Sequence, residues 1–342
     1  HMASLKDKGA ALQQAEQHKW TEYRKRYPQA AAELEALKTG RPTMDVAPLL
    51  PVFDASSKIA TRKASGMTLD ALMPHLPLVM GGSADLTPSN NTRFKGAEDF
   101  QKDHPAGRYI RFGVREHAMA AIMNGLAVTG IRPYGGTFLV FSDYMRGGMR
   151  VAALSHYPTI FVGTHDSIGV GEDGPTHQPI EHLASLRAMP NIIVFRPADA
   201  NETAQAWKWV LENPTGPVVL ALTRQGLPVL DQDRYPKAAD GVPRGAYVLV
   251  PQDNPDVLLL ATGSEVYLAL EAAETLAGQG IRAQVVSMPC WELFERQDQA
   301  YKDAVLPPAV KARVAVEAGV ELGWHKYIGP EGAFIGMKTF GA

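Results

Sequence analysis

The chain has 342 residues, of which 45% are hydrophobic and 20% are charged, and its formal net charge is −2. This composition is typical of a globular protein with about two domains of roughly 150 residues each. The balanced charge, without a long basic run, argues against a nucleic acid partner, and every apolar run is too short to span a membrane. The single cysteine, Cys290, excludes an intrachain disulfide and indicates a cytoplasmic protein.

The first sixty residues form no core of their own. Residues 5–38 are rich in Ala, Gln, Glu and Lys, which predicts helix in one or two pieces with a break at Pro28. Residues 40–52 contain three prolines and predict an extended connection. We therefore interpret residues 1–60 as a helical linker segment.

Residues 61–228 alternate between apolar runs and helical patterns. Strands are predicted at 78–82, 108–112, 159–163, 192–195 and 217–222, and helices at 116–128, 143–155, 181–186 and 202–211. Residues 134–141 form a further apolar and aromatic stretch. Residues 83–90 are predicted to be a loop. Such alternation favours a mostly parallel sheet covered by helices on both faces.

A second unit follows a segment rich in Pro, Asp and Gly at 225–245. Strands are predicted at 256–262, 281–287 and 313–317, with a helix at 265–277. Ser264 precedes that helix and is predicted to be its N-cap, with an anion site as the alternative. The predicted fold class is α/β, with two open, mostly parallel-sheet domains at 61–228 and 245–342.

Three stretches carry residues suited to chemistry. The loop 164–178, between a predicted strand and a helix, holds two histidines and three carboxylates, at the place where open parallel sheets bind ligands. Glu116 stands at another strand-to-helix junction, where the helix dipole favours a carboxylate. Phe138, Phe141 and Tyr144 are spaced by three, which fits either core packing or one wall of a ring-binding pocket. His177 and His182 lack a third ligand at suitable spacing, so no metal site is predicted.

Three strings resemble the transketolase family, whose enzymes depend on thiamine diphosphate. They are Ser-Ala-Asp-Leu-Thr-Pro-Ser-Asn at 83–90, Gly-Val-Arg-Glu-His at 113–117 and Glu-Asp-Gly-Pro-Thr-His-Gln at 172–178. The resemblance implies a pyrimidine-binding domain followed by a transketolase C-terminal domain. It also implies transfer of a two-carbon ketol unit from a ketose phosphate to an aldose phosphate, as in the pentose phosphate pathway. Dihydroxyacetone synthase stays open as an alternative.

The same resemblance implies roles for individual residues. Glu116 would contact the cofactor's aminopyrimidine and take part in catalysis together with His177. Phe138 would stack on the aminopyrimidine ring, and the remaining cofactor contacts would come from Phe141, Tyr144, Asp85 and Leu86. The sugar phosphate would be bound by Arg62, Ser89, His165, Asp173, His177 and Arg224, with the arginines on the phosphate.

The Gly-Asp-Gly motif that marks the family's magnesium site does not occur in this sequence. We therefore expect the Mg²⁺ ligands to lie in a separate N-terminal domain, and we expect this chain to be a fragment that is inactive alone. The resemblance also implies a homodimer. The alternative is a non-catalytic assembly module, or the C-terminal subunit of a split transketolase.

Overall fold

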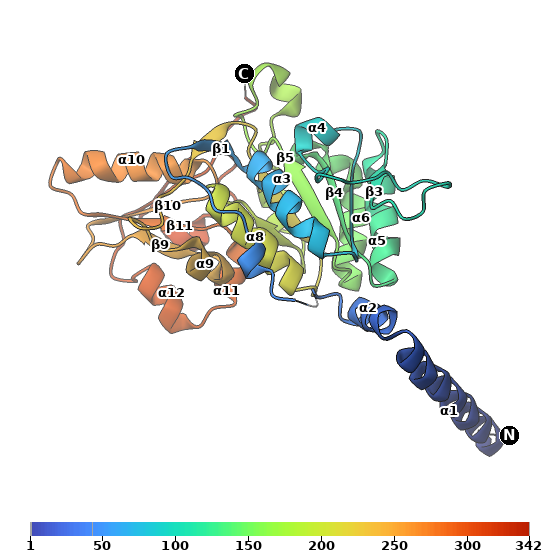
Figure 1. The fold of residues 1–342 in the computed structure, drawn as a ribbon. Coiled ribbons are helices and arrows are strands. Elements are labelled where there is room, and N and C mark those ends of the chain that lie inside the picture. The colour runs from blue at the N-terminus through green and yellow to red at the C-terminus, as the bar shows by residue number, and fades with distance from the viewer. Residues whose placement is uncertain (1, 43, 342) are drawn as a thin grey trace.

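The computed structural model describes residues 2–42 and 44–341, and its N-terminal part is a helical arm. Helix α1 (Met2–Arg26) extends away from the body of the molecule, and α2 (Pro28–Thr39) joins it to the body (Figure 1). Pro28 begins α2, where its missing N–H costs nothing, and Gly40 ends it in the left-handed conformation with φ 61°. The predicted break at Pro28 is therefore confirmed.

A six-stranded, fully parallel sheet forms the centre of the molecule, in the order β3-β2-β4-β5-β7-β6. Its strands are β2 (Val79–Ser83), β3 (Tyr109–Arg111), β4 (Arg132–Phe138), β5 (Ile160–Thr164), β6 (Ile193–Phe195) and β7 (Val218–Leu222). Five of these strands are buried along their whole length, as expected of parallel strands with helices on both faces, whereas the edge strand β3 ends in the exposed Arg111.

Alternate residues of these strands feed two separate cores. On one face Ile160 and Val162 pack with α3 (Thr61–Leu72) and α8 (Ala200–Glu212). On the other face Phe161 packs with α5 (Glu116–Val128), α6 (Ser142–Ser155) and α7 (His182–Arg187). The two-residue period of a strand thus distributes β5 between both layers, which Figure 1 shows on either side of the sheet.

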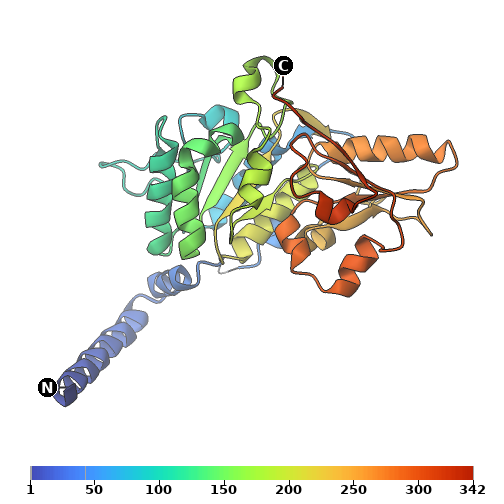
Figure 2. The ribbon, with the colours of Figure 1, turned by 180° about the vertical axis from the view of Figure 1, so that it is seen from behind.

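The second sheet has five strands in the order β13-β12-β10-β11-β9. They are β9 (Tyr247–Val250), β10 (Val257–Ala261), β11 (Ala283–Ser287), β12 (Arg313–Val316) and β13 (Ala333–Ile335). Only β9 runs antiparallel, against β11. Helix α10 (Glu265–Ala277) covers one face, and α11 (Trp291–Glu295), α12 (Gln299–Val305) and α13 (His325–Ile328) lie on the other (Figure 2). The predicted fold class is confirmed.

Several elements differ from the sequence predictions. The predicted loop at 83–90 contains the helix α4 (Thr87–Asn90), and strands β9 and β13 were not predicted. The linker and the Pro-rich segment also contribute a strand each, β1 (Lys58–Ala60) and β8 (Gly226–Pro228), which pair antiparallel. Three-residue strands carry too little periodicity to be seen in sequence, and this pair forms only because tertiary packing brings the two segments together.

Buried charges join the two sheets. Arg196, which follows β6 and is fully buried, donates to Asp166 Oδ2 at 2.8 Å and to the Thr262 carbonyl at 3.1 Å, and it pairs with Glu265 at the start of α10. Arg187 of α7 donates to both carboxylate oxygens of Glu317 at 2.8 Å each.

The start of α10 therefore differs from both readings of Ser264. Its hydroxyl donates to Glu265 at 2.6 Å and makes no cap hydrogen bond, because the Arg196 guanidinium occupies this helix end. Among residues 2–42 and 44–341, no helix is long and apolar enough to cross a membrane.

Candidate functional site

The predicted site residues gather at one edge of the six-stranded sheet. Asp85 follows β2, Glu116 follows β3, Phe138 ends β4, His165 follows β5 and Arg224 follows β7. Because all these strands are parallel, their carboxyl ends meet at the same edge, the usual ligand-binding edge of an open α/β sheet.

Four aromatic rings and His177 form a continuous cluster at this edge. The His165 ring lies 3.7 Å from the Phe138 ring centroid, and Phe141 stacks on Phe138 at 5.7 Å with an interplanar angle of 13°. Phe141 also contacts Tyr144 at 5.9 Å and His177 at 5.5 Å. The cluster therefore runs from the buried Phe138 outward to the exposed Tyr144.

This arrangement changes the expectation for Phe138. Its side chain is only 6% exposed, since His165 and Phe141 both lie against it, so little ring surface is left for a ligand. Phe141, one helical turn further along, is half-buried and presents a more accessible ring. Spacing in the sequence could not rank the two rings, because their burial depends on the histidine after β5.

Two arginines face one another beside the aromatic cluster. Arg62, from the first turn of α3, donates from Nη1 to the Ser89 carbonyl at 2.6 Å. Arg224 Nε lies 3.9 Å from Asp173 Oδ2. Burial, and then the charge of Arg224, lower the pKa of Arg62 below its usual value. Two like charges close enough for one to lower the pKa of the other are suited to an anionic ligand that would neutralise both.

His165 is held in an unusual state between these groups. Its backbone has φ 59° in the left-handed region, its side chain is 3% exposed, and its Nδ1 lies 2.9 Å from Thr164 Oγ1. Burial first, and then Arg62, Arg224 and His177, lower its pKa to about 3. The imidazole is therefore neutral at pH 7 and offers one donor and one acceptor.

Glu116 is the first residue of α5 and is 7% exposed, yet no hydrogen bond from the described residues reaches its carboxylate. Buried carboxylates are normally hydrogen-bonded, so this group fits a ligand that donates at the sheet edge. Asp85 is exposed with φ 62°, and Leu86 is half-buried. All three lie at the same edge of the sheet as the aromatic cluster.

Two threonines missed by the sequence reasoning hold the arginines in place. Thr61 and Thr223 exchange two backbone-to-hydroxyl hydrogen bonds, of 3.0 and 2.7 Å, although 162 positions separate them. Each precedes one of the arginines, Arg62 or Arg224, so this pairing fixes the two backbone positions from which the arginine side chains extend. No local pattern reveals such a pair, because its geometry arises only from the fold.

One group of possible metal ligands lies near the cluster. Asp143, Glu181 and His182 bring one ligand atom each within 4.8 Å of one another, and His182 Nε2 lies 3.1 Å from Asp143 Oδ2. Magnesium prefers an all-oxygen environment with near-octahedral geometry. This histidine-containing group does not fit a magnesium ion that would bind a diphosphate.

Comparison with known proteins places these observations in a family. The pyrimidine-binding domain model of transketolase matches residues 57–229, and the transketolase-like C-terminal domain model matches residues 245–342. Transketolase from Geobacillus stearothermophilus is 51% identical over 95% of this chain and 49% of its own length. Transketolase from Aquifex aeolicus is 49% identical over 98% of this chain and 48% of its own length.

Solved structures agree with this result. Transketolase from Pichia stipitis, in complex with sedoheptulose 7-phosphate, superposes with a TM-score of 0.91 at 46% identity, covering 98% of this chain and 50% of that one. Transketolase from Leishmania mexicana gives a TM-score of 0.90 at 48% identity, covering 98% and 49%. The chain spans about half the length of these relatives, and it belongs to the transketolase family.

Proposed function

We propose that this chain forms the aminopyrimidine and sugar-phosphate half of a thiamine-diphosphate-dependent transketolase. The activity is transfer of a two-carbon ketol unit from a ketose phosphate to an aldose phosphate. The observation that carries the proposal is the facing pair Arg62 and Arg224 beside the neutral His165 and the aromatic cluster, all at one sheet edge. The related structure from Pichia stipitis, which holds a seven-carbon sugar phosphate, supports this substrate class.

We assign the cofactor contacts to Glu116, Phe141, Phe138, Tyr144, Asp85 and Leu86. When bound, thiamine diphosphate supplies the carbon nucleophile for ketol transfer. Glu116 would hydrogen-bond a ring nitrogen of the aminopyrimidine, donating to the neutral ring as a carboxylic acid and accepting from the ring once that nitrogen is protonated. Phe141 takes the stacking position, with Phe138 supporting it from behind and Tyr144 at the rim, because Phe141 has the more accessible of the two inner rings.

We assign the substrate contacts from the charge of each side chain and from its position in the site. Arg62 and Arg224 bind the phosphate, joined by Ser89 and by the neutral His165, which donates or accepts without adding charge. Asp173, 3.9 Å from Arg224, and His177, against Phe141, lie further along the same loop and contact the sugar hydroxyls. His177 also shares a proton with the substrate during transfer.

The cofactor diphosphate and its Mg²⁺ need a second half that contributes oxygen ligands, from the same polypeptide or from another one. We propose a linker at 1–60, a pyrimidine-binding domain at 61–228 and a C-terminal domain at 245–342.

The second half would cover the outer surface of α5 and α6, which pack side by side and begin next to the site. That surface exposes five large hydrophobic side chains: Ile122, Val128, Tyr144, Val151 and Leu154. Apolar surface of this kind marks an interface, and a homodimer with sites between subunits fits it.

The test mixes this chain with the remaining half of the Geobacillus stearothermophilus transketolase, thiamine diphosphate and Mg²⁺. Ketol transfer is expected from the mixture and not from the chain alone. Glu116→Gln should lower kcat by at least about 100-fold, as expected for loss of a general acid–base group. The matched control Glu212→Gln, at the far end of α8, should leave kcat unchanged. Turnover by the chain alone, or a fully active Glu116→Gln mixture, would contradict the proposal.

The alternative is a non-catalytic assembly module or one subunit of a split transketolase. A solved split-gene transketolase, described as an inactive β4 tetramer, is 29% identical with a TM-score of 0.67 and covers 83% of this chain and 90% of its own. Tight association of the two halves without turnover in the mixture would favour this alternative.

A further inference from the structure

A buried arginine at the opposite edge of the central sheet lacks a counter-ion. Arg132, the first residue of β4, is 3% exposed and donates from Nη2 to the Val210 carbonyl at 2.6 Å. Its Nε and Nη1 reach no acceptor in residues 2–42 or 44–341. Burial alone lowers the pKa of Arg132 to about 9, with no nearby carboxylate to oppose it. Buried charges are ordinarily paired, so this guanidinium is built to receive a partner.

The arginine lines a cavity of about 330 Å³ between α2 and the sheet. Most of the lining is apolar and comes from three elements, including Ala32 and Ala36 of α2, Leu78 before β2, and Leu211 of α8. A concave, largely apolar pocket with a few convergent polar groups is the usual form of a small-molecule site. The only acidic side chain in the lining is Glu33.

We propose that this cavity binds a small organic anion that carries one carboxylate on an apolar body. The carboxylate would accept a hydrogen bond from one of the two unsatisfied nitrogens of Arg132, Nε or Nη1, and the body would lie against α2 and Leu211. Arg41 also lines the cavity but is exposed, so within residues 2–42 and 44–341 Arg132 is the buried guanidinium of the lining whose nitrogens lack acceptors. A single negative charge matches this buried group, while Glu33 would repel a second charge. Desolvated guanidinium–carboxylate hydrogen bonds are among the stronger polar contacts in proteins.

This pocket is distinct from the candidate active site. Arg132 begins β4 and Phe138 ends it, so at roughly 3.3 Å per residue the two are about 20 Å apart along one strand. A ligand in the pocket would not compete with a sugar phosphate. It would instead hold α2, and with it the helical arm, against the body, since Ala36 is buried there.

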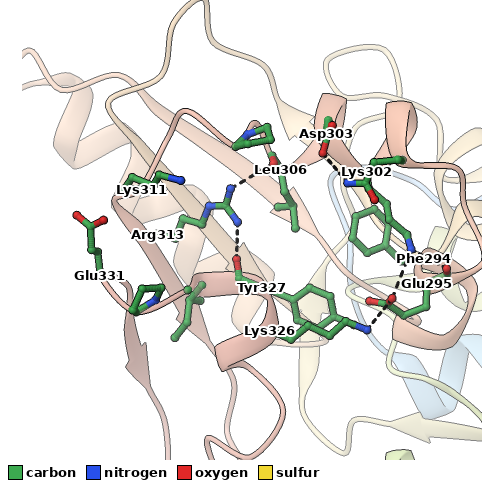
Figure 3. A pocket seen from close by; sticks show the side chains of 15 residues that line it. Phe294, Glu295, Lys302, Asp303, Leu306, Lys311, Arg313, Lys326, Tyr327 and Glu331 are labelled. Atoms are coloured by element: carbon green, nitrogen blue, oxygen red, sulfur yellow. Dashed lines mark hydrogen bonds and ion pairs between the residues drawn. The ribbon is translucent and has the colours of Figure 1, made fainter.

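A second cleft, of about 380 Å³, lies in the C-terminal part of the chain beside the five-stranded sheet. Arg313 and Glu295, which line it, already have partners within the protein. Arg313 donates to four backbone carbonyls, including those of Leu306 and Tyr327, and Glu295 pairs with both Lys302 and Lys326. Figure 3 shows Lys326 turned toward Glu295, and Arg313 turned toward the backbone near Leu306 and Tyr327. Their internal pairing leaves no strong demand for a ligand, which singles out the Arg132 cavity.

The experiment is calorimetric titration of the complete 342-residue chain with octanoate, with thermal unfolding measured in parallel. Saturable one-to-one binding and a raised Tm are expected, whereas 1-octanol, which lacks the charge, should do neither. Arg132→Met should weaken octanoate binding at least tenfold. Ala32→Phe, which keeps the arginine but fills the cavity from α2, should do the same.

Ala15→Phe, an equal change on the exposed α1, serves as the control and should bind octanoate like the unmodified chain. Circular dichroism establishes that each variant is folded. If Arg132→Met fails to fold, Ala32→Phe decides the question alone. The proposal is overturned if octanoate does not bind, if it binds Ala32→Phe undiminished, or if 1-octanol binds equally well. Tighter binding of inorganic phosphate than of octanoate would also overturn it.

Discussion

Replacing Arg196 with methionine should lower the free energy of unfolding by weakening the buried ion pairs that join the two sheets. The guanidinium is fully buried and contacts Asp166, Thr262 and Glu265, with Glu317 3.9 Å away. Methionine fills much of the same volume but leaves buried carboxylates without their cation. Glu317 keeps its two hydrogen bonds from Arg187, and Glu265 keeps the Ala318 amide at 2.9 Å, so Asp166 is the group left without compensation.

The magnitude follows from the protonation of Asp166. Burial raises the pKa of this carboxyl group, and Arg196 opposes that rise. Without the Arg196 cation, burial raises the pKa of the Asp166 carboxyl group still further. The folded variant must therefore take up a proton at pH 7, at about 1.4 kcal/mol per pH unit above the unfolded pKa, which gives a loss of about 4 kcal/mol. This agrees with the roughly 3–5 kcal/mol found when one partner of a buried ion pair is removed.

The sign of the pH dependence makes this prediction sharper. A carboxylate whose folded pKa is raised contributes stability at low pH and loses it as pH rises. The deficit of Arg196→Met should therefore shrink from about 4 kcal/mol at pH 7 to about 1.5 kcal/mol at pH 5. Urea unfolding followed separately by tryptophan fluorescence and far-UV circular dichroism measures it and shows whether the two sheets unfold together.

A partner substitution provides the control. Arg196→Met combined with Asp166→Leu removes the uncompensated carboxylate and should recover at least half of the lost stability. A loss under about 1 kcal/mol at pH 7, or a double variant no more stable than Arg196→Met, would refute the reasoning, because the network would then be energetically neutral.

Three further predictions concern single residues. Burial, and then a neighbouring acid, raise the pKa of Glu202 from 4.5 to about 7, so stability should fall as pH rises through that range, and Glu202→Gln should flatten this part of a pH–Tm profile. The pKa of His165 near 3 predicts that its ring signals in NMR spectra do not titrate between pH 8 and 5, and that the folded state loses stability as pH falls from 6.5 toward 3. A Cβ at Gly81 would lie 1.8 Å from the Tyr134 ring, so Gly81→Ala should cost about 1–3 kcal/mol, whereas Gly125→Ala in open space on α5 should stabilise by up to about 1 kcal/mol; chemical unfolding compares them.

Long elements were predictable because their periodicity is local. The helices predicted at 116–128 and 265–277 agree residue for residue with α5 and α10. Five of the six strands of the central sheet were anticipated from apolar runs, since a parallel strand buried on both faces must be apolar throughout, whereas β4 was recognised only as an apolar and aromatic stretch. Strand β9 was missed because Tyr247–Val250 is short and lies at the edge of its sheet, where alternate residues are only partly buried and need not be apolar.

The site was only partly predictable. Its residue types and their places after successive strands could be read from the sequence, because parallel strands bring their carboxyl ends together. The burial of each aromatic ring could not be read from the sequence. Phe138 and Phe141 look equivalent in the string 137–144, yet His165, which follows a different strand, covers only Phe138. The Arg132 cavity was equally hidden, because an arginine opening an apolar run reads as a surface residue until α2 is packed beside it.

The second sheet contributes none of the predicted site residues. The buried charges nevertheless connect it to the loop that carries His165. Asp166 directly follows His165, and its carboxylate is held by Arg196, which is itself anchored to Thr262 and Glu265 of the second sheet and α10. His165 sits in a left-handed conformation that a residue with a side chain adopts only when its surroundings enforce it. The ion pair one residue later supplies that enforcement. The C-terminal domain therefore acts on the candidate site by fixing the backbone of the loop 164–178, and Arg196→Met should release His165 as well as destabilise the fold.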